Sequence, residues 1–320
     1  MEASGGEEYP HRGISRPGAL LAVNFGPATD AYRSTRIVLL DLPNESVCES
    51  AAACWAGASL TRRSISSMMP PMRARTVTPA HIADHIRRVL KDGGSAPHAE
   101  GVQHFFKEEI QSRGWYTAEL RKVAVRFRRT IVKERGPDFL VQVADNLFSG
   151  DILEEKAFAV YLLQTLTHEF GDKQFRLFES WLGRISNWAD HDALVHYLIA
   201  PMIAADPARI NYVYRWAKSR DRWHRRAACV ALIQGTRQKM FLPEITRLTD
   251  QLLGDDDDMV QKGLGWLLRE TAKADPKNTI AYLMRIRSRA PRLVLRTACE
   301  TLPRATRAVV LGNARRAASA

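Results

Sequence analysis

The segment Val260-Gln-Lys-Gly-Leu-Gly-Trp-Leu-Leu-Arg-Glu270 shows the pattern on which the fold depends. Its residues form a strong helical pattern, yet two glycines, Gly263 and Gly265, lie in the interior. Each glycine costs a helix about 1 kcal/mol relative to alanine. We therefore expect a neighbouring helix or a ligand to approach this segment closely.

Helical patterns extend in both directions from this segment, starting at Thr78. Thr78-Pro79 is typical of a helix start, with an N-cap followed by proline at the first helical position. The spacing of apolar residues predicts a helix after Thr117 and another after Asp151-Ile-Leu-Glu, which resembles a capping box. Further helices are predicted at residues 173–186, 190–203, 206–218, 221–235, 241–253, 256–273, 277–288 and 291–302. No convincing strand pattern follows residue 78.

The predicted helices recur at a fairly regular interval. Corresponding helix starts are 36, 31, 37 and 31 residues apart, near Lys156, Asp192, Trp223, Val260 and Pro291. Two helices per repeat at about this period are typical of HEAT or armadillo arrays. The sequence therefore predicts an all-α, HEAT-like helical-repeat solenoid over residues 78–320. A basic concave face on such a solenoid would suit a rod-like polyanion such as duplex DNA.

Residues 1–77 differ in composition from the rest of the chain. They are rich in Gly, Ser, Ala and Pro, and two short apolar runs, Leu20–Phe25 and Ile37–Leu42, have the length of strands. No further pattern completes a sheet, so we expect a low-complexity, poorly ordered extension. An upstream start codon assigned in error is the alternative, since Met69 and Met72 lie just before the helical pattern.

The charge of the chain points to a polyanionic partner. The formal net charge is +12, of which residues 1–75 carry +1 and the remainder +11. Such a balance indicates nucleic acid or an anionic membrane. No apolar run reaches the roughly 18 residues that suggest a membrane span, so a membrane is not expected.

The four cysteines do not indicate a metal site or disulfides. None forms a C-x-x-C pair or has zinc spacing with histidine. Cys229 and Cys299 lie within helical patterns and are expected to be buried, which fits a reducing compartment. We expect a cytoplasmic protein, nucleoid-associated in a bacterium, without metal or nucleotide cofactor.

The segment Ile185-Ser-Asn-Trp-Ala-Asp-His-Asp192 is the first candidate for chemistry. Trp188 and Asp192 are four residues apart, so on a helix their side chains share a face. Ser186 or Asn187 would cap that helix. The structural alternative is a core tryptophan and a first-turn acid that the helix dipole favours.

Two further segments combine tryptophan with cations. Arg222-Trp-His-Arg-Arg226 gathers three guanidiniums in little more than one helical turn, which favours a phosphate-binding turn or a solvated basic face, and both readings stay open. On the glycine-containing helix, Lys262, Trp266, Arg269 and Glu270 share one face. An aromatic residue between two cations is unusual for a purely apolar core stripe.

Five segments together carry a resemblance to a known family. They are Glu154-Glu-Lys-Ala-Phe-Ala159, Asn187-Trp-Ala-Asp-His-Asp192, Trp223-His-Arg-Arg-Ala-Ala228, Val260–Glu270 and Pro291-Arg-Leu-Val-Leu-Arg-Thr-Ala-Cys-Glu-Thr-Leu-Pro303. In order and approximate spacing they resemble the DNA alkylation repair glycosylases of the AlkD family, over roughly residues 80–305. The family's Gly-Val-x-x-Pro stretch is replaced here by Ser112-Arg-Gly-Trp-Tyr-Thr-Ala-Glu-Leu-Arg121, so the N-terminal DNA contacts are expected to differ.

The resemblance implies an activity and a set of residues. It implies excision of 3-methyladenine and 7-methylguanine by hydrolysis of the N-glycosidic bond, without a base-flipping pocket. Trp188, Asp192 and Trp266 match the family's active-site trio. Either Arg225 or Arg226 matches its phosphate-binding arginine.

Such chemistry requires little of the protein, because an alkylated cationic purine is already a good leaving group. Asp192 is expected to stabilise the oxocarbenium-like sugar, and His191, the nearest acid, is expected to point to another face. The two indoles would contact the cationic base and sugar. Phosphate contacts are assigned to Arg225 or Arg226, Lys262 and Arg269, and Trp223 is expected to contribute to DNA binding. The expected partner is double-stranded DNA bound by a monomer; the alternatives are a non-catalytic DNA-binding solenoid and a protein-binding scaffold.

Overall fold

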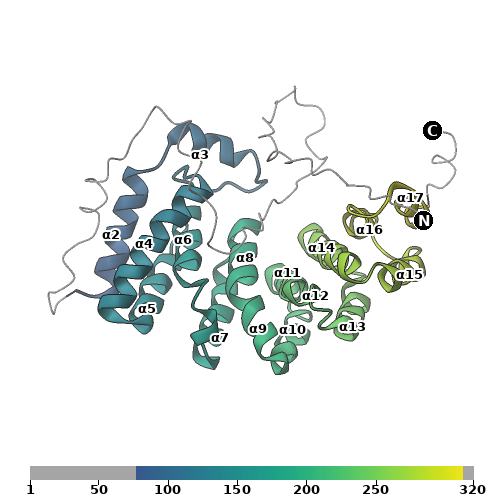
Figure 1. Ribbon diagram of the computed structural model, residues 1–320. Helices are drawn as coiled ribbons and strands as arrows, with labels where there is room; N and C mark the ends of the chain where they lie inside the picture. The colour runs from purple at the N-terminus through teal and green to yellow at the C-terminus, as the bar shows by residue number, and fades with distance from the viewer. Residues whose placement is uncertain (1–76, 313–320) are drawn as a thin grey trace, which may run out of the picture. The chain divides into compact units, whose positions relative to one another are not determined.

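The computed structural model describes residues 77–312, all within one compact unit, Leu60–Ala320 (Figure 1). Regular secondary structure in this range is helical, and the β contact that it contains is an isolated bridge between Gln111 and Ile152. The prediction of an all-α helical-repeat fold is confirmed. Among the described helices, none combines the length and the apolar character that a membrane span needs. The extension and the two strand-like runs predicted before residue 77 lie outside the described residues.

The first helices of the series begin largely as their sequence predicts. They are α2 (Pro79–Asp92), α3 (Ala96–Gln103), α4 (Thr117–Arg135), α5 (Pro137–Phe148) and α6 (Leu153–Leu163). The Thr78 side chain caps α2, and Pro79 takes the first helical position. The predicted capping box at Asp151 is wrong. Ile152 is the N-cap of α6, and the Leu153 N–H donates to the Gln111 carbonyl of a distant segment instead of to a side chain.

The remaining helices continue to the end of the described range. They are α7 (Asp172–Trp181), α8 (Trp188–Leu194), α9 (Ala200–Ala205), α10 (Ile210–Trp216), α11 (Arg222–Val230), α12 (Ile233–Thr236), α13 (Leu242–Leu252), α14 (Asp258–Ala274), α15 (Pro276–Ile286), α16 (Arg292–Ala298) and α17 (Arg304–Val310). Where the sequence predicted one helix at 190–203, α8 passes into α9 through a π-helical turn, Val195–Ile199. Such turns occur often at functional sites.

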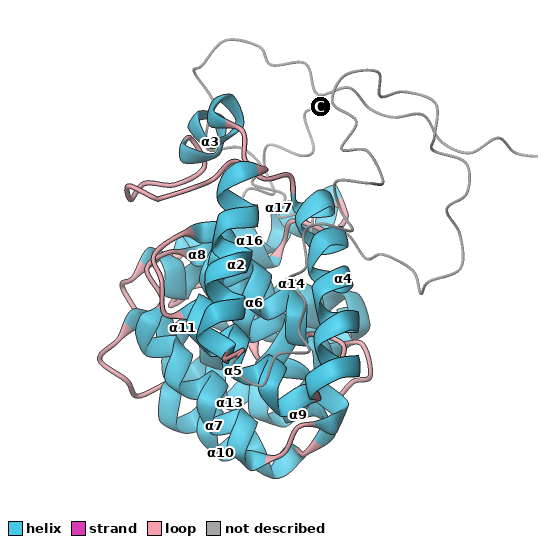
Figure 2. Cartoon of the chain, turned by 90° about the vertical axis from the view of Figure 1, so that its left-hand side faces the viewer, coloured by secondary structure: helices cyan, strands magenta, loops and turns pink. Residues whose placement is uncertain are grey.

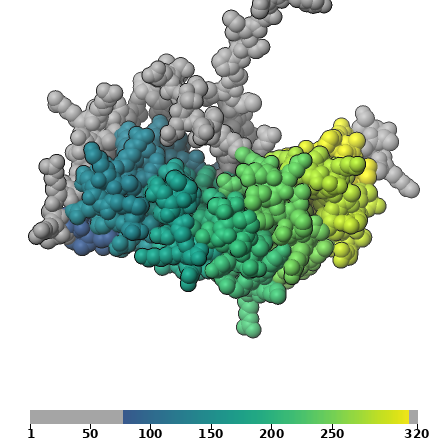
Figure 3. Space-filling model, turned by 60° about the horizontal axis from the view of Figure 1, so that its bottom comes forward, coloured from purple at the N-terminus to yellow at the C-terminus, as the bar shows by residue number. Residues whose placement is uncertain are grey.

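The helices stack in a continuous row. Helix α4 packs on α6, α6 on α8, α8 on α11, α11 on α14, and α14 on α16. A second set lies beside this row, with α5 against α6, α10 against α11, and α13 and α15 against α14 (Figure 1). The space-filling view shows the same order on the surface, where the colour passes from the N-terminal to the C-terminal helices without interruption (Figure 3). The apolar core lies between the two sets of helices and is shared by successive pairs.

The two glycines of α14 lie where neighbouring helices approach it. A Cβ atom at Gly265 would lie 2.6 Å from the Cβ of Thr297 and 3.0 Å from the carbonyl oxygen of Val294, both on α16. At Gly263 it would lie 3.2 Å from the Cγ of Arg226 on α11. The close approach expected from these glycines is confirmed for both neighbours.

Helix α3 and the segment that follows it project beyond the packed helices (Figure 2). No residue of α3 is buried. We call residues 104–115, which connect α3 to α4, the strap. Its C-terminal end is held by the buried Glu154 carboxylate, which accepts hydrogen bonds from the Ser112 hydroxyl and from the backbone N–H groups of Arg113, Gly114 and Trp115 at 2.7–3.3 Å.

Candidate active site

Helix α8 carries the first two residues of the predicted trio. Its N-cap is Asn187, whose side-chain oxygen accepts hydrogen bonds from the N–H groups of Ala189 and Asp190 at 3.0 Å. This cap starts the helix at Trp188 and places Asp192 four residues later on the same side. Trp188 is partly buried, whereas Asp192 is only 3% exposed.

The Asp192 carboxylate lies in a buried ion pair with α11. Arg226 donates from Nε to Oδ1 at 2.9 Å and from Nη2 to Oδ2 at 2.8 Å, and its Nη1 donates to the Met259 carbonyl at 2.6 Å. Burial by itself would raise the pKa of the Asp192 carboxyl, but the Arg226 guanidinium and a hydrogen bond with His191 lower it to about 2. The carboxylate is therefore ionised at neutral pH.

His191 also contacts this carboxylate, which corrects the prediction that it points to another face. Its Nδ1 lies 2.7 Å from Asp192 Oδ1, and its Nε2 lies 3.0 Å from the Trp223 carbonyl. The Asp192 carboxylate contacts Arg226 and the His191 ring contacts the Trp223 carbonyl, so both side chains lie against α11. Burial lowers the pKa of His191, although the Asp192 hydrogen bond raises it. The ring is fully buried, so it can orient the carboxylate but cannot contact a nucleotide in this conformation.

Each of the two candidate tryptophans has an aromatic ring stacked on it. Phe106 of the strap stacks on Trp188, with ring centroids 5.0 Å apart and planes at 14°. His196, in the π-helical turn after α8, stacks on Trp266 of α14 at 6.4 Å and 19°. This second contact brings Trp266 against the helix that carries Trp188 and Asp192. Each indole thus has one face covered by protein.

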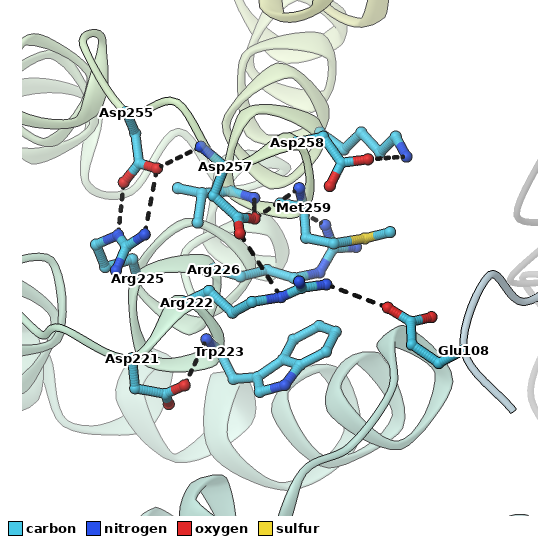
Figure 4. Close-up of polar contacts among 12 residues, drawn as sticks. Glu108, Asp221, Arg222, Trp223, Arg225, Arg226, Asp255, Asp257, Asp258 and Met259 are labelled. Atoms are coloured by element: carbon cyan, nitrogen blue, oxygen red, sulfur yellow. Dashed lines mark hydrogen bonds and ion pairs between the residues drawn. The ribbon is translucent and has the colours of Figure 1, made fainter. Parts of the chain in front are cut away.

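The cations assigned to phosphate binding are paired with carboxylates in this structure. The pairs are Arg225 with Asp255, Arg226 with Asp192, Lys262 with Asp258, and Arg269 with both Glu270 and Glu300. Trp223 is buried beneath the guanidinium of Arg222, which lies 4.7 Å from the ring centroid. Figure 4 shows the α11 arginines extending toward the acidic loop before α14. Phosphate binding by the assigned residues stays a prediction.

The strap reaches this region from the N-terminal helices. Besides the Phe106 ring, it contributes Lys107, whose Nζ lies 3.0 Å from Asp258. It also contributes Glu108, which lies 3.4 Å from Arg222 (Figure 4). These ion pairs are partly exposed and are each worth at most about 1 kcal/mol. This crossing could not be predicted from the sequence, because loop contacts follow no periodicity.

A second buried charge pair lies beside the trio and was missed by the sequence analysis. The Lys156 Nζ of α6 lies 3.2 Å from the Asp190 carboxylate of α8 and donates to the Arg184 carbonyl at 2.7 Å. Burial raises the pKa of Asp190 to about 6, although Lys156 and Asn187 lower it. The signal that could have found this pair is the run of charges at the start of an otherwise apolar helix, Leu153–Leu163.

Known proteins resemble the chain in sequence and in fold. The model of a family described as "DNA alkylation repair enzyme" matches residues 86–302. A solved structure described as a "Predicted DNA alkylation repair enzyme from Enterococcus faecalis" superposes with a TM-score of 0.59 and 16% identity, over 66% of this chain and 97% of that one. At this identity the likeness shows the fold. No curated protein matches the sequence.

Proposed function

Since the chain belongs to the DNA alkylation repair enzyme family, we propose that it is a DNA glycosylase. Its substrates would be cationic alkylated purines of the 3-methyladenine and 7-methylguanine type, released by hydrolysis of the N-glycosidic bond. The observation that carries the proposal is the Asp192 carboxylate, which lies on the same helix as Trp188 and is held by Arg226, with Trp266 stacked on His196 of the turn that follows this helix. A DNA repair role follows from the family; the reaction and the substrates are the proposal.

Asp192 would act on the sugar. As the glycosidic bond stretches, positive charge develops on the deoxyribose, and a fixed carboxylate stabilises that charge. His191 and Arg226 occupy two lone-pair positions on Oδ1 and one on Oδ2. A carboxylate has about four such positions, so one on Oδ2 is left for the sugar or for the attacking water. Since only 3% of the residue is exposed, side chains around it must move when DNA binds.

Arg226 would position the Asp192 carboxylate in this mechanism. Its bidentate contact keeps the carboxylate ionised and fixes its orientation, and the buried guanidinium is only 4% exposed. The more accessible Arg225, Lys262 and Arg269 remain the proposed phosphate-binding residues, and Trp223 at the start of α11 remains a proposed DNA-binding residue. Each cation would exchange its carboxylate partner for a phosphate.

The indoles would bind the cationic base. Phe106 stacks on Trp188 and His196 on Trp266; Trp188 is partly exposed and Trp266 only 8% exposed, so Trp188 offers the more accessible ring to a ligand. A cation over such a face gains about 0.5–2 kcal/mol. A neutral damaged base lacks this cation–π contact and is a poor leaving group, so neutral lesions are expected to be poor substrates.

The test is release of free base from duplex DNA that carries 7-methylguanine. The wild type should release it, and Asp192→Asn should lower the single-turnover rate by on the order of 10²-fold or more, as removal of one electrostatic contact to a transition state does. Its affinity for undamaged duplex should stay close to that of the wild type. The matched control is Asp172→Asn, which changes an exposed aspartate at the start of α7 that pairs with Arg209.

Two outcomes would contradict the assignment. A folded Asp192→Asn protein with the wild-type rate would remove the carboxylate from the mechanism. Efficient release of uracil, abolished by His191→Ala, would point to acid-assisted excision instead. Under our proposal, a bulky cationic N7 adduct should be released. Tight DNA binding without any base release would favour a non-catalytic DNA-binding protein.

A further inference from the structure

Arg121 on α4 is a cation held between two aromatic rings. Its guanidinium carbon lies 4.8 Å from the ring centroid of Tyr161 and 5.2 Å from that of Tyr197. Its Nη2 donates to the Tyr197 hydroxyl at 2.6 Å. The side chain is partly buried and is held between the two rings.

The charge of Arg121 has no acidic partner within residues 77–312. The partly buried cations of α11 and α14 each lie within ion-pair distance of a carboxylate, as described above. In contrast, no carboxylate of the described residues lies that close to Arg121, and its buried Nε has no hydrogen-bond partner among them. The two tyrosines offset part of the cost of withdrawing this cation from water, but they supply no carboxylate charge to pair with it. The arrangement is that of a site prepared for an anion.

Ring contacts connect Arg121 to the candidate active site. The Tyr197 ring meets His196 edge-on, at 5.0 Å between centroids and 88° between planes. His196 in turn stacks on Trp266, at 6.4 Å and 19°. Arg121 is thus separated from the candidate indole by two aromatic side chains that contact one another.

We propose that Arg121 binds a backbone phosphate of DNA close to the damaged nucleotide. The inference rests on the proposed function and adds a site to it. A guanidinium presents its donors in a planar fork that matches two phosphate oxygens, and stacking between tyrosines holds that fork in place before binding. Lysine has neither the planar fork nor the stacking surface, so Arg121→Lys should keep the charge but lose part of the affinity.

The experiment measures binding of undamaged duplex DNA as a function of salt concentration. Loss of one phosphate contact lowers the slope of log affinity against log salt by about 0.9. Arg121→Gln should show this change, and Arg121→Lys should keep the slope with weaker binding. The matched control is Arg126→Gln, which removes the same charge from an exposed position on the same helix and should behave like the wild type.

A second variant addresses the orientation of the guanidinium. Tyr197→Phe keeps the ring and removes the hydroxyl that accepts from Arg121. It should keep the slope and bind DNA severalfold more weakly, with a thermal unfolding transition near that of the wild type. Wild-type binding by Arg121→Gln would overturn the phosphate site, as would the absence of any DNA binding by the wild type.

Base release, scored separately, distinguishes this inference from the proposed function. If the wild type binds DNA in an Arg121-dependent way but releases no base, the phosphate site stands and the glycosylase fails. If the wild type releases base while Arg121→Gln binds like Arg126→Gln, the glycosylase stands and the phosphate site fails.

Discussion

At the scale of single residues, the candidate site depends on charges that are buried in pairs. Helical spacing predicts Trp188 and Asp192 on one face of a helix, and the structure places both residues on α8. It did not predict that Arg226, 34 residues later, meets Asp192, because periodicity defines the faces of one helix and not the helix that each face contacts. The same reason explains the missed Lys156–Asp190 pair and the wrong prediction for His191.

The Asp190 carboxyl gives a pH-dependent contribution to stability. Its pKa of about 6 in the folded protein lies above the ordinary value of 3.8, so the folded state binds the proton more tightly than the unfolded chain does. The resulting stability is fully present below about pH 4 and is lost as the pH rises to about 6. The difference in free energy of unfolding between wild type and Asp190→Asn should therefore fall across this range, by up to roughly 3 kcal/mol.

Urea unfolding of both proteins at several pH values measures this difference. Asp192, whose lowered pKa acts in the opposite direction and below pH 4, contributes equally to both proteins and cancels. A difference that grows between pH 4 and 6 would mean that attraction to Lys156 outweighs the cost of burial.

At the scale of helices, the glycines of α14 indicated close packing but not the identity of the neighbour. The cost of Gly263 and Gly265 indicated a close neighbour, and the structure supplies one on each side, α11 and α16. The sequence left open whether that neighbour was a helix or a ligand. The position of the strap could not be predicted from the sequence, because it depends on contacts with Glu154, Arg222 and Asp258, which lie on three separate helices.

Replacement of Gly265 by alanine should destabilise the protein although alanine is the better helix former. The new Cβ would lie within 3.0 Å of Thr297 and of the Val294 backbone, so α14 and α16 must separate, at a cost of about 1–3 kcal/mol. Gly101→Ala in α3 is the matched control, since nothing lies within 4 Å of its Cβ position, and it should be neutral or stabilising by up to about 1 kcal/mol. Chemical denaturation of the two variants tests this, and equal stability would refute the steric account.

At the scale of the whole molecule, the features that carry the function gather after residue 75. The repeat spacing of the sequence correctly indicated a series of helix pairs, because each pair must bury its apolar side against the next. The family match begins at residue 86, the first described helix begins at Pro79, and +11 of the net charge of +12 lies in residues 76–320. The first 75 residues contain none of the segments that resemble the family.

Removal of residues 1–75 should therefore leave base release and DNA affinity close to those of the full chain. The melting temperature should also change little, because α2 keeps its Thr78 cap and its buried contacts with α5. Differential scanning calorimetry and the base-release assay on the two proteins provide the measurement. A large fall in melting temperature would show that the removed residues stabilise the helical unit.

The pairing of Asp192 with Arg226 also constrains how this chain can evolve. Loss of either partner leaves an uncompensated charge in an interior that is nearly closed to water, whereas joint replacement removes both charges together. The two positions should therefore vary together among homologous chains. A lineage that abandons the carboxylate should abandon the arginine too, so an arginine retained without its aspartate would mark a protein in which that arginine has acquired another anion to bind.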